Sequence, residues 1–251
     1  MEKTELYRFF LKDSIRKSID FRTTDQSRGV PAPPVEKPFD PDVARIQLPS
    51  PAQWAPHIEK TDLVHAIAGR KSRRKFTSGA LSIEQTAFLL WATQGIRKVA
   101  GPNVAYRTVP SAGARHSFET YLFVMRVDDL QPGLYRYLPL ENELLKMGDI
   151  DQMKERLSTA CFGQNFVAES AVTFVWAALP YRMEWRYAHA AHRVILIDAG
   201  HVCQNLYLAC EAIHAGTCAV GAYDQDLLDE LIQVDGIDEF AVYLAPVGKI
   251  K

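Results

Sequence analysis

The sequence predicts an α+β fold in which helices and strands follow one another in a mixed order. The chain has 251 residues and is 47% hydrophobic, which is enough apolar side chain for a full core. Its strand-like segments are few and irregularly joined, which argues against a doubly wound parallel sheet. Residues 186–215 contain scarcely a helix breaker except Gly200. We therefore expect a long central helix there, buried on nearly all faces.

Residues 1–60 differ in composition from the rest and are expected to form a separate extension. Apolar side chains among charged ones between Tyr7 and Ile19 predict an amphipathic helix that ends before Arg22. Eight of the fourteen prolines lie between residues 31 and 56. Because proline fixes φ and removes an amide donor, this stretch should be an extended surface arm, without a helix or an inner strand. With Trp54 to bury, the arm would wrap a neighbouring subunit; the alternative is a flexible leader.

Residues 61–251 are expected to form one domain. Ser82 and Gln85 have the spacing of a capping box at the start of a helix. Small-residue loops at 110–114 and 217–223 would let backbone amides approach a flat ligand closely. Helices are predicted at 61–69, 81–95, 149–161 and 226–232, and strands at 121–125, 133–137, 171–179 and 240–247.

Charge and hydropathy exclude several classes of partner. The formal net charge of -1 gives no general attraction to nucleic acid or to an anionic membrane. No apolar run approaches the roughly 20 residues of a membrane span, and the charged N-terminus lacks the apolar core of a signal peptide. The four cysteines form no Cys-x-x-Cys pair. This predicts a cytoplasmic protein with reduced, mostly buried thiols.

Five cations are crowded into the seven residues from Arg70 to Phe76. The preceding helix should end at Gly69 and the backbone should then be extended. Arg70, Ser72 and Arg74 would point to one side, and Lys71 to the other. An arginine fork with a hydroxyl matches the charge and the acceptor oxygens of a phosphate. The alternatives are a solvated basic turn and a nucleic-acid patch, and the near-zero net charge disfavours the second.

Several common cofactor and catalytic motifs are missing from the sequence. There is no Gly-x-Gly-x-x-Gly and no Gly-x-x-x-x-Gly-Lys-[Ser/Thr], so a nicotinamide nucleotide would bind transiently, as a diffusible reductant. Ser111 is not part of a Gly-x-Ser-x-Gly elbow. His189 and His192 could share a helix face, with His201 further along the helix, but no carboxylate or cysteine stands at matching spacing. We therefore predict no metal site.

Seven short motifs occur in a fixed order between about residues 61 and 251. They are Arg70-Lys71-Ser72-Arg73-Arg74-Lys75-Phe76, Leu89-Leu90-Trp91-Ala92-Thr93-Gln94-Gly95, Pro110-Ser111-Ala112-Gly113-Ala114, Gly133-Leu134-Tyr135, Asp198-Ala199-Gly200-His201, Gln204-Asn205-Leu206 and Pro246-Val247-Gly248-Lys249. In this order they resemble the FMN-dependent nitroreductase-like family, most of all its branch of SagB-type azoline dehydrogenases. The resemblance implies a homodimer with FMN in a cleft shared by both subunits, built on a mixed, largely antiparallel sheet flanked by helices.

The resemblance also implies roles for individual residues. Arg70 and Ser72 match positions that hold the FMN phosphate, with Lys71 and the C-terminal Lys249 as further candidates, and Arg74 matches the position that reaches the pyrimidine edge. Pro110, Ser111 and Ala112, with Gly113 beside them, match a loop that the other subunit supplies to the isoalloxazine. Val220 and Gly221 match a loop whose backbone amides face flavin N5. Gln164 matches a polar contact of the flavin.

The implied function is that of an FMN-dependent oxidoreductase with ping-pong kinetics. It would take electrons from NAD(P)H or an organic donor and pass them to a small-molecule acceptor such as a nitro compound, a quinone or an azoline-type ring. Because the flavin carries the hydride, the lack of a triad or metal cluster is expected. The nearest branch has a Lys-Tyr pair where this chain has Arg186-Tyr187, so Tyr187 is the candidate proton carrier.

Two points stay open from the sequence. A protein of the same fold with a closed pocket would sequester flavin or sense a ligand without turnover, and this is the alternative function. The walls of the substrate pocket are expected to come from variable loops, here residues 96–107 and 181–187.

Overall fold

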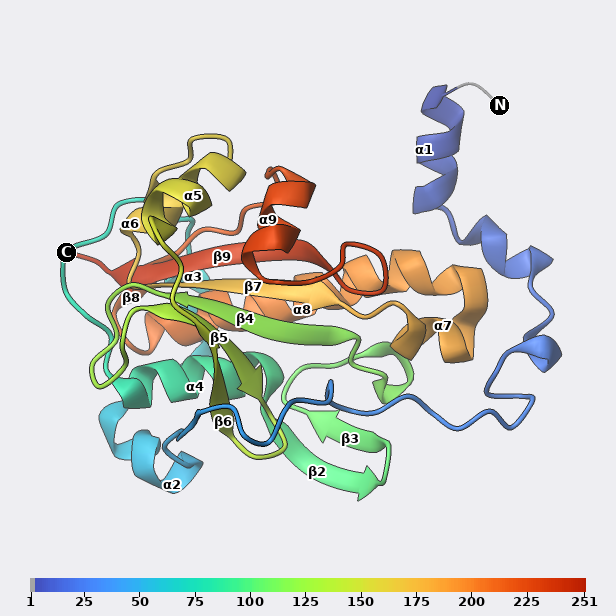
Figure 1. The fold of residues 1–251 in the computed structure, drawn as a ribbon, viewed down its shortest axis with the longest axis horizontal. Helices are drawn as coiled ribbons and strands as arrows, with labels where there is room; N and C mark the ends of the chain where they lie inside the picture. Colours follow the sequence, from blue (N-terminus) through green and yellow to red (C-terminus); the bar gives the residue numbers. More distant parts are fainter. Residues whose placement is uncertain (1–2) are drawn as a thin grey trace.

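A central antiparallel sheet organises residues 3–251, which the computed structural model describes (Figure 1). Its strand order is β1-β6-β5-β4-β7-β9-β8, and neighbouring strands in this part of the chain pair antiparallel. The predicted α+β fold with a largely antiparallel sheet is confirmed. The strands are β1 (Arg45–Gln47), β4 (Phe118–Val124), β5 (Gly133–Leu138), β6 (Glu143–Gly148), β7 (Val172–Ala178), β8 (Ala215–Thr217) and β9 (Phe240–Lys249).

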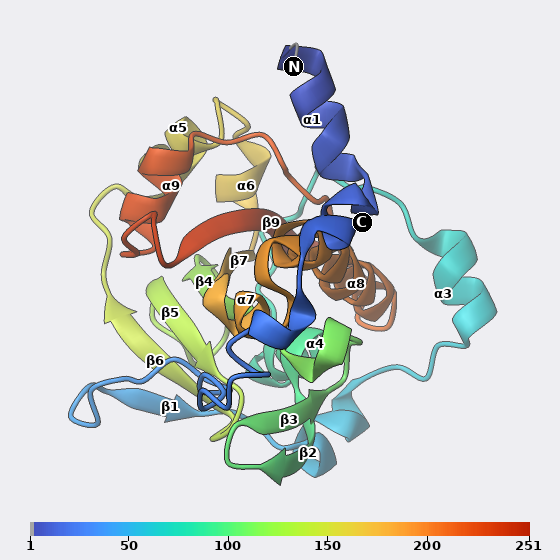
Figure 2. The same cartoon turned by 90° about the vertical axis from the view of Figure 1, so that its right-hand side faces the viewer.

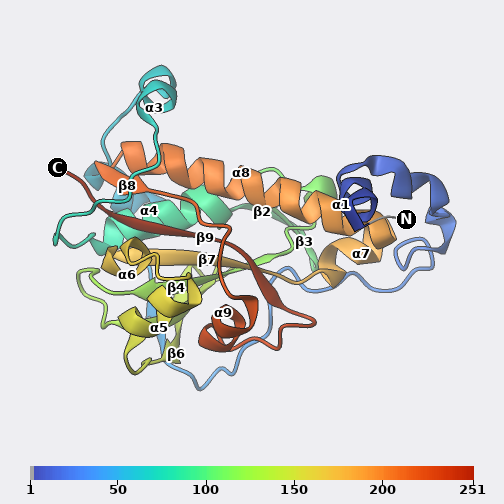
Figure 3. The ribbon, with the colours of Figure 1, turned by 90° about the horizontal axis from the view of Figure 1, so that it is seen from above.

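Helices cover both faces of the sheet. Figure 3 shows α4 (Ile83–Gln94) and α8 (Ala191–Glu211) on one face, and α5 (Met153–Ala160), α6 (Phe166–Glu169) and α9 (Gln225–Leu231) on the other. Because successive side chains of a strand point to opposite faces, Phe174 and Trp176 of β7 join the core under α4 and α8. Val175 between them joins the core under α5 and α9. Both faces of β7 are therefore buried.

Local sequence fixes two of the helix starts. The side chain of Ser82 accepts a hydrogen bond from the amide of Gln85, so the predicted capping box opens α4. The carboxylate of Asp62 accepts from the amide of His65 and opens α3 (Leu63–Gly69). The expected helix at 149–161 starts later, at Met153, because its N-cap Gln152 has a left-handed φ of 48°, and it ends at Ala160.

The expected helix over residues 186–215 is divided. α7 (Tyr181–Tyr187) and a short 3-10 turn precede α8, because Ala188 has φ 45° and ψ -135°, which lie outside helical geometry. The prediction that this helix is buried on nearly all faces is also wrong for the single chain, since Leu196 is 47% exposed and Ile197 44%. Arg186 and Tyr187 therefore belong to a separate element, α7.

The proline-rich arm packs on the core of its own chain, which buries Trp54 without a neighbouring subunit. The ring of Trp54 lies 5.1 Å from that of Phe88 and 5.2 Å from that of Trp91, both on α4. Pro51 opens a short helix, α2 (Pro51–Trp54), so the prediction of no helix in this stretch is wrong. Proline is tolerated there because the first turn of a helix needs no amide donor.

The predicted N-terminal helix ends earlier than expected. α1 (Lys3–Leu11) projects from the body of the molecule, as Figure 1 shows, and a 3-10 turn follows it. Arg193 of α8 donates to the carbonyl of Leu11 at 2.9 Å and holds the base of α1. Residues 96–107, expected to be a loop, form a separate hairpin of β2 (Ile96–Gly101) and β3 (Val104–Arg107).

Buried charges fasten the arm to the sheet. Glu119 of β4 lies 2.5 Å from the guanidinium of Arg182 and also accepts the amide of Lys37 at 2.9 Å. The ammonium of Lys37 lies 2.5 Å from Glu239, just before β9. Lys37 of the arm is therefore held by charge-assisted hydrogen bonds to β4 and to the residue that precedes β9.

Glu36 makes the stability of this attachment depend on pH. Burial first, and then its hydrogen bond with Glu141, raise the pKa of Glu36 to about 8. The folded chain thus holds this proton more tightly than the unfolded chain does, so the free energy of unfolding falls as the pH rises from about 5 to about 8. The loss should be on the order of a few kcal/mol. Glu36→Gln should remove most of it, and thermal unfolding of both proteins across this range checks the result. A variant with the same pH dependence as the wild type would contradict this assignment.

Candidate functional site

Arg70 and Ser72 meet at Tyr207 of α8. The segment after α3 is extended, and Ser72 forms a parallel bridge with Thr217 of β8. The guanidinium carbon of Arg70 lies 5.2 Å from the ring centroid of Tyr207, and Ser72 Oγ lies 2.9 Å from Tyr207 Oη. The predicted alternation is confirmed for this pair, because both side chains lie on the same side of the segment.

The side chain of Arg73 points away from the side on which Arg70 and Ser72 lie. Its Nη1 lies 2.6 Å from Glu211 Oε1, and its amide donates to the carbonyl of Thr217. Lys71 is exposed. Arg70 and Lys71 have no carboxylate partner within the described residues, whereas the charge of Arg73 is already matched. An ordered cation without a carboxylate is the arrangement that an anionic ligand such as a phosphate would complete.

Tyr207 links the basic segment to the second small-residue loop. Its Oη accepts the amide of Ala219 at 2.9 Å, in addition to its contact with Ser72. The sequence reasoning missed this residue, because a tyrosine between Leu206 and Leu208 was counted as part of an apolar helix. The available signal was its phenol oxygen, which needs a polar partner when the ring is buried.

Arg74 contacts the segment of residues 164–166, and Gln164 joins that segment to the second small-residue loop. The guanidinium carbon of Arg74 lies 5.8 Å from the ring of Phe166 on α6. Gln164 Nε2 donates to the carbonyl of Ala222 at 2.9 Å. Three stretches far apart in sequence, the basic run, residues 164–166 and residues 219–222, are therefore gathered at one place.

Val220 and Gly221 differ in what their amides can do. The amide of Val220 donates to the carbonyl of Leu244 at 2.8 Å, so the expectation that it faces the flavin is wrong. Gly221 is exposed, and its amide has no acceptor within residues 3–251. Gly221 is therefore the residue of this pair with a donor free for a ligand.

Lys249 lies where the chain after the basic run meets the end of β9. The amide of Thr77 donates to the carbonyl of Lys249 at 2.8 Å. The ammonium of Lys249 donates to the carbonyl of Ile213 at 3.0 Å, and its burial lowers the pKa of this lysine. Its charge is directed at the C-terminal end of α8 in this structure, and its role toward a phosphate stays a prediction.

The first small-residue loop lies against the N-terminal half of α8. The amide of Ala112 donates to Asp198 at 3.2 Å, and burial raises the pKa of that carboxyl group. Ser111 Oγ accepts the amide of His116 at 2.9 Å. Asp198 precedes Tyr207 by nine residues, or about 14 Å along a helix. The contacts of one chain therefore leave this loop apart from the basic segment.

Gly113 allows α7 to approach this loop. Its φ is 59°, and a Cβ there would stand 2.7 Å from Tyr187 Oη and 2.9 Å from Arg186 Nε. Any larger residue would have to displace those side chains. Tyr187 Oη has no hydrogen-bond partner in the described part of the chain. The candidate proton carrier is thus beside the loop that the resemblance assigns to the flavin ring.

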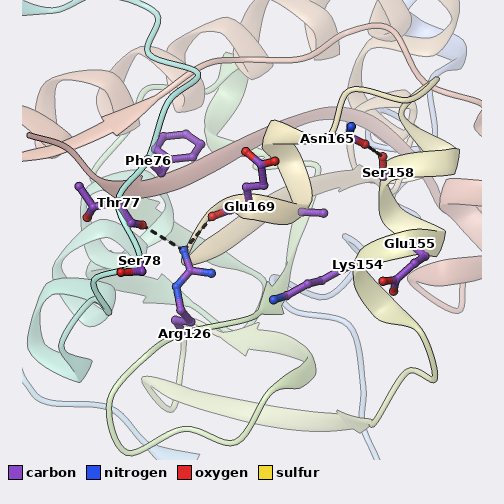
Figure 4. Close-up of a pocket in the computed structure, with 10 residues that line it drawn as sticks. Phe76, Thr77, Ser78, Arg126, Lys154, Glu155, Ser158, Asn165 and Glu169 are labelled. Carbon is purple, nitrogen blue, oxygen red and sulfur yellow. Dashed lines mark hydrogen bonds between the residues drawn. The ribbon is translucent and has the colours of Figure 1, made fainter.

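A cavity of about 640 Å³ lies next to the basic segment, between the residues that follow it and helices α5 and α6 (Figure 4). Figure 4 shows Arg126 between Thr77 and Glu169, and it donates to their carbonyls at 3.3 and 2.7 Å. Arg126 therefore fastens the chain beyond Arg74 to the helix that carries Phe166. The residues that line this cavity include none of the predicted site residues.

An apolar surface lies beside the site. Figures 2 and 3 show α3 projecting from the body of the molecule, and Leu63, Val64 and Ile67 on it are 63%, 76% and 56% exposed. A groove of about 570 Å³ runs between α3, α4 and α8, and Leu208 of α8 lines it. Leu196 and Ile197 are exposed separately, nearer the N-terminal end of α8. A helix as short as α3 is not stable in isolation, and a large apolar patch of this kind usually marks a protein interface.

The remaining expectations concern metals, membranes and thiols. The four cysteines are free and buried, as predicted. Within residues 3–251, no group of three or more His, Cys, Asp or Glu side chains is placed to hold a metal ion. The helices of this same range are all too short or too polar to cross a membrane.

Comparison with known proteins decides the family. The model of the Nitroreductase family matches residues 67–249. The chain belongs to this family. A relative from Methanocaldococcus jannaschii, named "Putative nitroreductase", is 30% identical over 208 residues, which are 83% of this chain and 98% of the relative.

Solved structures share the fold. A "putative nitroreductase" from Ralstonia eutropha has a TM-score of 0.65 and 25% identity, covering 88% of this chain and 99% of that one. One from Anabaena variabilis has a TM-score of 0.67 and 20% identity over 84% of this chain, which spans 42% of that longer protein.

Two further structures share the fold at lower identity. A chain of the Escherichia coli microcin synthetase McbBCD complex with truncated pro-MccB17 has a TM-score of 0.60 and 18% identity, over 86% of this chain and 78% of that one. The NADPH:FMN oxidoreductase of Vibrio harveyi in complex with NAD+ has a TM-score of 0.52 and 15% identity, over 74% and 67%.

Proposed function

We propose that this nitroreductase-family protein is an FMN-dependent oxidoreductase that acts as a homodimer in the cytoplasm. The observation that supports this most directly is the arrangement of Arg70 and Ser72 on Tyr207. These two side chains offer a hydroxyl and a cation, and the cation forms no ion pair among the described residues. The same tyrosine holds the loop whose Gly221 amide is free.

The residues present fit the parts of FMN. When bound, FMN would supply the chemistry of accepting and donating a hydride. Arg70 and Ser72 would hold its phosphate by charge-assisted hydrogen bonds, with Lys71 and Lys249 as further cations. Arg74 lies two residues beyond Ser72, about 7 Å along an extended chain, and would hold the pyrimidine edge together with Gln164. The free Gly221 amide would stabilise negative charge that develops on the reduced ring.

A second subunit would complete the site. The loop of Pro110, Ser111 and Ala112 lies apart from Arg70 within one chain, so another copy must bring this loop to the cofactor held by the first. The apolar surface on α3 and α8 is the part of the molecule that such a copy would cover. The homodimer therefore accounts both for the divided site and for the exposed apolar helices.

The donor and the acceptor are proposed as classes. The donor is NAD(P)H or an organic hydride donor, bound transiently, and the similarity in fold to the Vibrio harveyi oxidoreductase supports a nicotinamide. The acceptor is a nitro compound, a quinone or an azoline-type ring. The similarity in fold to a microcin synthetase chain supports the azoline-type ring, which is the acceptor of the SagB-type branch.

The absorption spectrum of the purified protein tests this proposal. We expect the bands of an oxidised flavin, release of FMN on heating, and bleaching by NAD(P)H that a nitro or quinone acceptor reverses. A colourless protein that does not take up added FMN would overturn the proposal. Bound FMN that no reductant reaches would instead support the flavin-sequestering alternative.

Tyr187→Phe is expected to lower kcat about 100-fold with substrates that exchange a proton, and to leave the FMN content unchanged. Tyr187 Oη lacks a partner within the described chain, so its removal leaves no buried group unsatisfied. Tyr181→Phe is the matched control at the other end of α7, where the hydroxyl binds Asp25. Steady-state rates for both variants check the result. Unchanged turnover of Tyr187→Phe with every substrate would exclude this role.

A further inference from the structure

A cavity of about 440 Å³ lies between the β2–β3 hairpin and the Pro110–Ala114 loop. Arg97, Tyr106 and Arg107 of the hairpin line it, and Ser111 and His116 close it from the other side. Among the described residues, no carboxylate belongs to this lining. The wall therefore combines cations with neutral hydrogen-bonding groups and contains nothing that would repel an anion.

Arg97 lines this cavity and also the groove between α3, α4 and α8, and it is a cation without an ion pair in the described chain. The register between β2 and β3 shifts between Ile96 and Lys98, so Arg97 is the extra residue of a β-bulge. A bulge interrupts the alternation of side chains and can turn one toward a site. Arg97 is exposed and has neither an ion pair nor a hydrogen bond within residues 3–251. Lys98, the next residue, does not line the cavity.

Arg107 is a buried residue of the lining, and its guanidinium donates into its own chain. Its Nη1 donates to Gln94 at 2.7 Å and its Nη2 to the carbonyl of Val35 at 2.8 Å, while its Nε is buried without a partner in the described chain. Burial first, and then repulsion by Arg182, lower the pKa of Arg107 to about 10. This side chain is therefore still charged at neutral pH, and no adjacent carboxylate is paired with it in the described range.

Positive charges surround His116 in the lining of this cavity. Burial first, and then Arg107, Arg115 and Arg182, lower the pKa of His116 to about 3. Glu119, the nearby carboxylate, is already 2.5 Å from Arg182. The imidazole of His116 is consequently neutral and offers one N–H to a ligand. Tyr106, which is 47% exposed, adds a hydroxyl at the rim.

We propose that this cavity binds an anionic group of the substrate, a carboxylate or a phosphate, while the reacting part of the same molecule lies beyond Ser111 at the flavin. Ser111 belongs both to the cavity and to the loop assigned to the isoalloxazine, so one small molecule can reach both places. The inference rests on the proposed function and narrows its substrates to anionic small molecules. Two sources share this chemistry, the carboxylate of an acceptor and the 2′-phosphate of NADPH.

Matched acceptors and one charge substitution test this proposal. 4-Nitrobenzoate and 4-nitrobenzamide carry the same nitro group and differ in charge. If the cavity binds the carboxylate of an acceptor, the wild type should show a KM about tenfold lower for 4-nitrobenzoate than for 4-nitrobenzamide. Arg97→Gln should remove that preference without changing the KM for 4-nitrobenzamide. Lys98→Gln makes the same change in charge on the next residue and should leave both values unaltered.

The KM values for NADPH and NADH distinguish the phosphate of the donor from the carboxylate of the acceptor. If Arg97→Gln instead raises the KM for NADPH about tenfold and leaves that for NADH unchanged, the bound group is the phosphate of the donor. Either pattern supports the cavity as an anion site. Equal KM values within both pairs, unaffected by Arg97→Gln, would overturn it.

A binding measurement keeps this inference distinct from the proposed function. Isothermal titration of the purified protein with benzoate and with inorganic phosphate needs no turnover. At least one anion should bind, and Arg97→Gln should weaken it about tenfold while Lys98→Gln does not. A protein that binds neither anion contradicts the anion site even if it turns over nitro compounds. A protein that binds an anion through Arg97 but takes up no FMN contradicts the proposed function instead.

Discussion

Arg70→Gln is expected to weaken FMN binding about 100-fold. A charge-assisted arginine–phosphate contact contributes about 1.5–3 kcal/mol, and glutamine keeps a donor but removes the charge. The fold should be nearly unaffected, because the Arg70 side chain contacts the ring of Tyr207, an interaction worth about 1 kcal/mol or less at a partly exposed site. Quenching of FMN fluorescence during titration with apoprotein measures the dissociation constant.

Lys75→Gln is the control for this variant. Lys75 lies in the same basic run, is exposed, and has no ion pair within residues 3–251. Its substitution removes the same charge and should change the dissociation constant less than about threefold, as a distant screened charge does. Equal losses in the two variants would show that the run acts only through its overall charge. No loss in Arg70→Gln would remove the central contact of the proposed site.

Ile197→Glu is expected to give a monomer that no longer retains FMN. Ile197 is 44% exposed in the single chain, so the fold should tolerate the change. In a dimer that buries this face of α8, each carboxylate would have to lose its water without a partner, which costs several kcal/mol. The monomer would then lack the loop of Pro110, Ser111 and Ala112 that the other subunit supplies. Light scattering gives the mass, and the absorption spectrum gives the flavin content.

Leu227→Glu provides the matched comparison. Leu227 is 39% exposed on α9, which lies on the other face of the sheet from α8 (Figure 3). The same chemical change there should leave both the mass and the flavin content as in the wild type. A wild-type protein that is monomeric and yet holds FMN would contradict the shared site, and so would a dimeric Ile197→Glu variant with full flavin content.

Much of the fold could be predicted because short-range chemistry decides it. Ser82 and Gln85 fix the start of α4, and the continuous apolar run of β7 places it inside the sheet. The misses depend on features that residue type does not encode. Ala188 breaks the long helix although alanine favours helices, and its conformation is held by the surrounding structure. The β2–β3 hairpin has bulges, which disturb the period-two pattern by which strands are found.

The candidate site, like the fold, could be predicted where neighbouring residues decide the geometry and could not where distant segments meet. The shared direction of Arg70 and Ser72 follows from the geometry of an extended chain and was predictable. The engaged amide of Val220 was not, because its acceptor on Leu244 belongs to a strand that is distant in sequence. Tyr207 was missed for a related reason. Its two polar partners, Ser72 and Ala219, lie in segments that only the folded chain brings together.

The change in composition near residue 60 does not coincide with a break in packing. β1 of the arm covers the outer edge of β6, and Arg45 pairs with Leu145 in that register. A sheet whose last strand is left open offers its unpaired amides and carbonyls to other molecules, which is a common start of aggregation. β1 is itself the new last strand, but it is only three residues long. The arm therefore shortens the open edge of the sheet, and we expect its removal to lower the solubility of this protein.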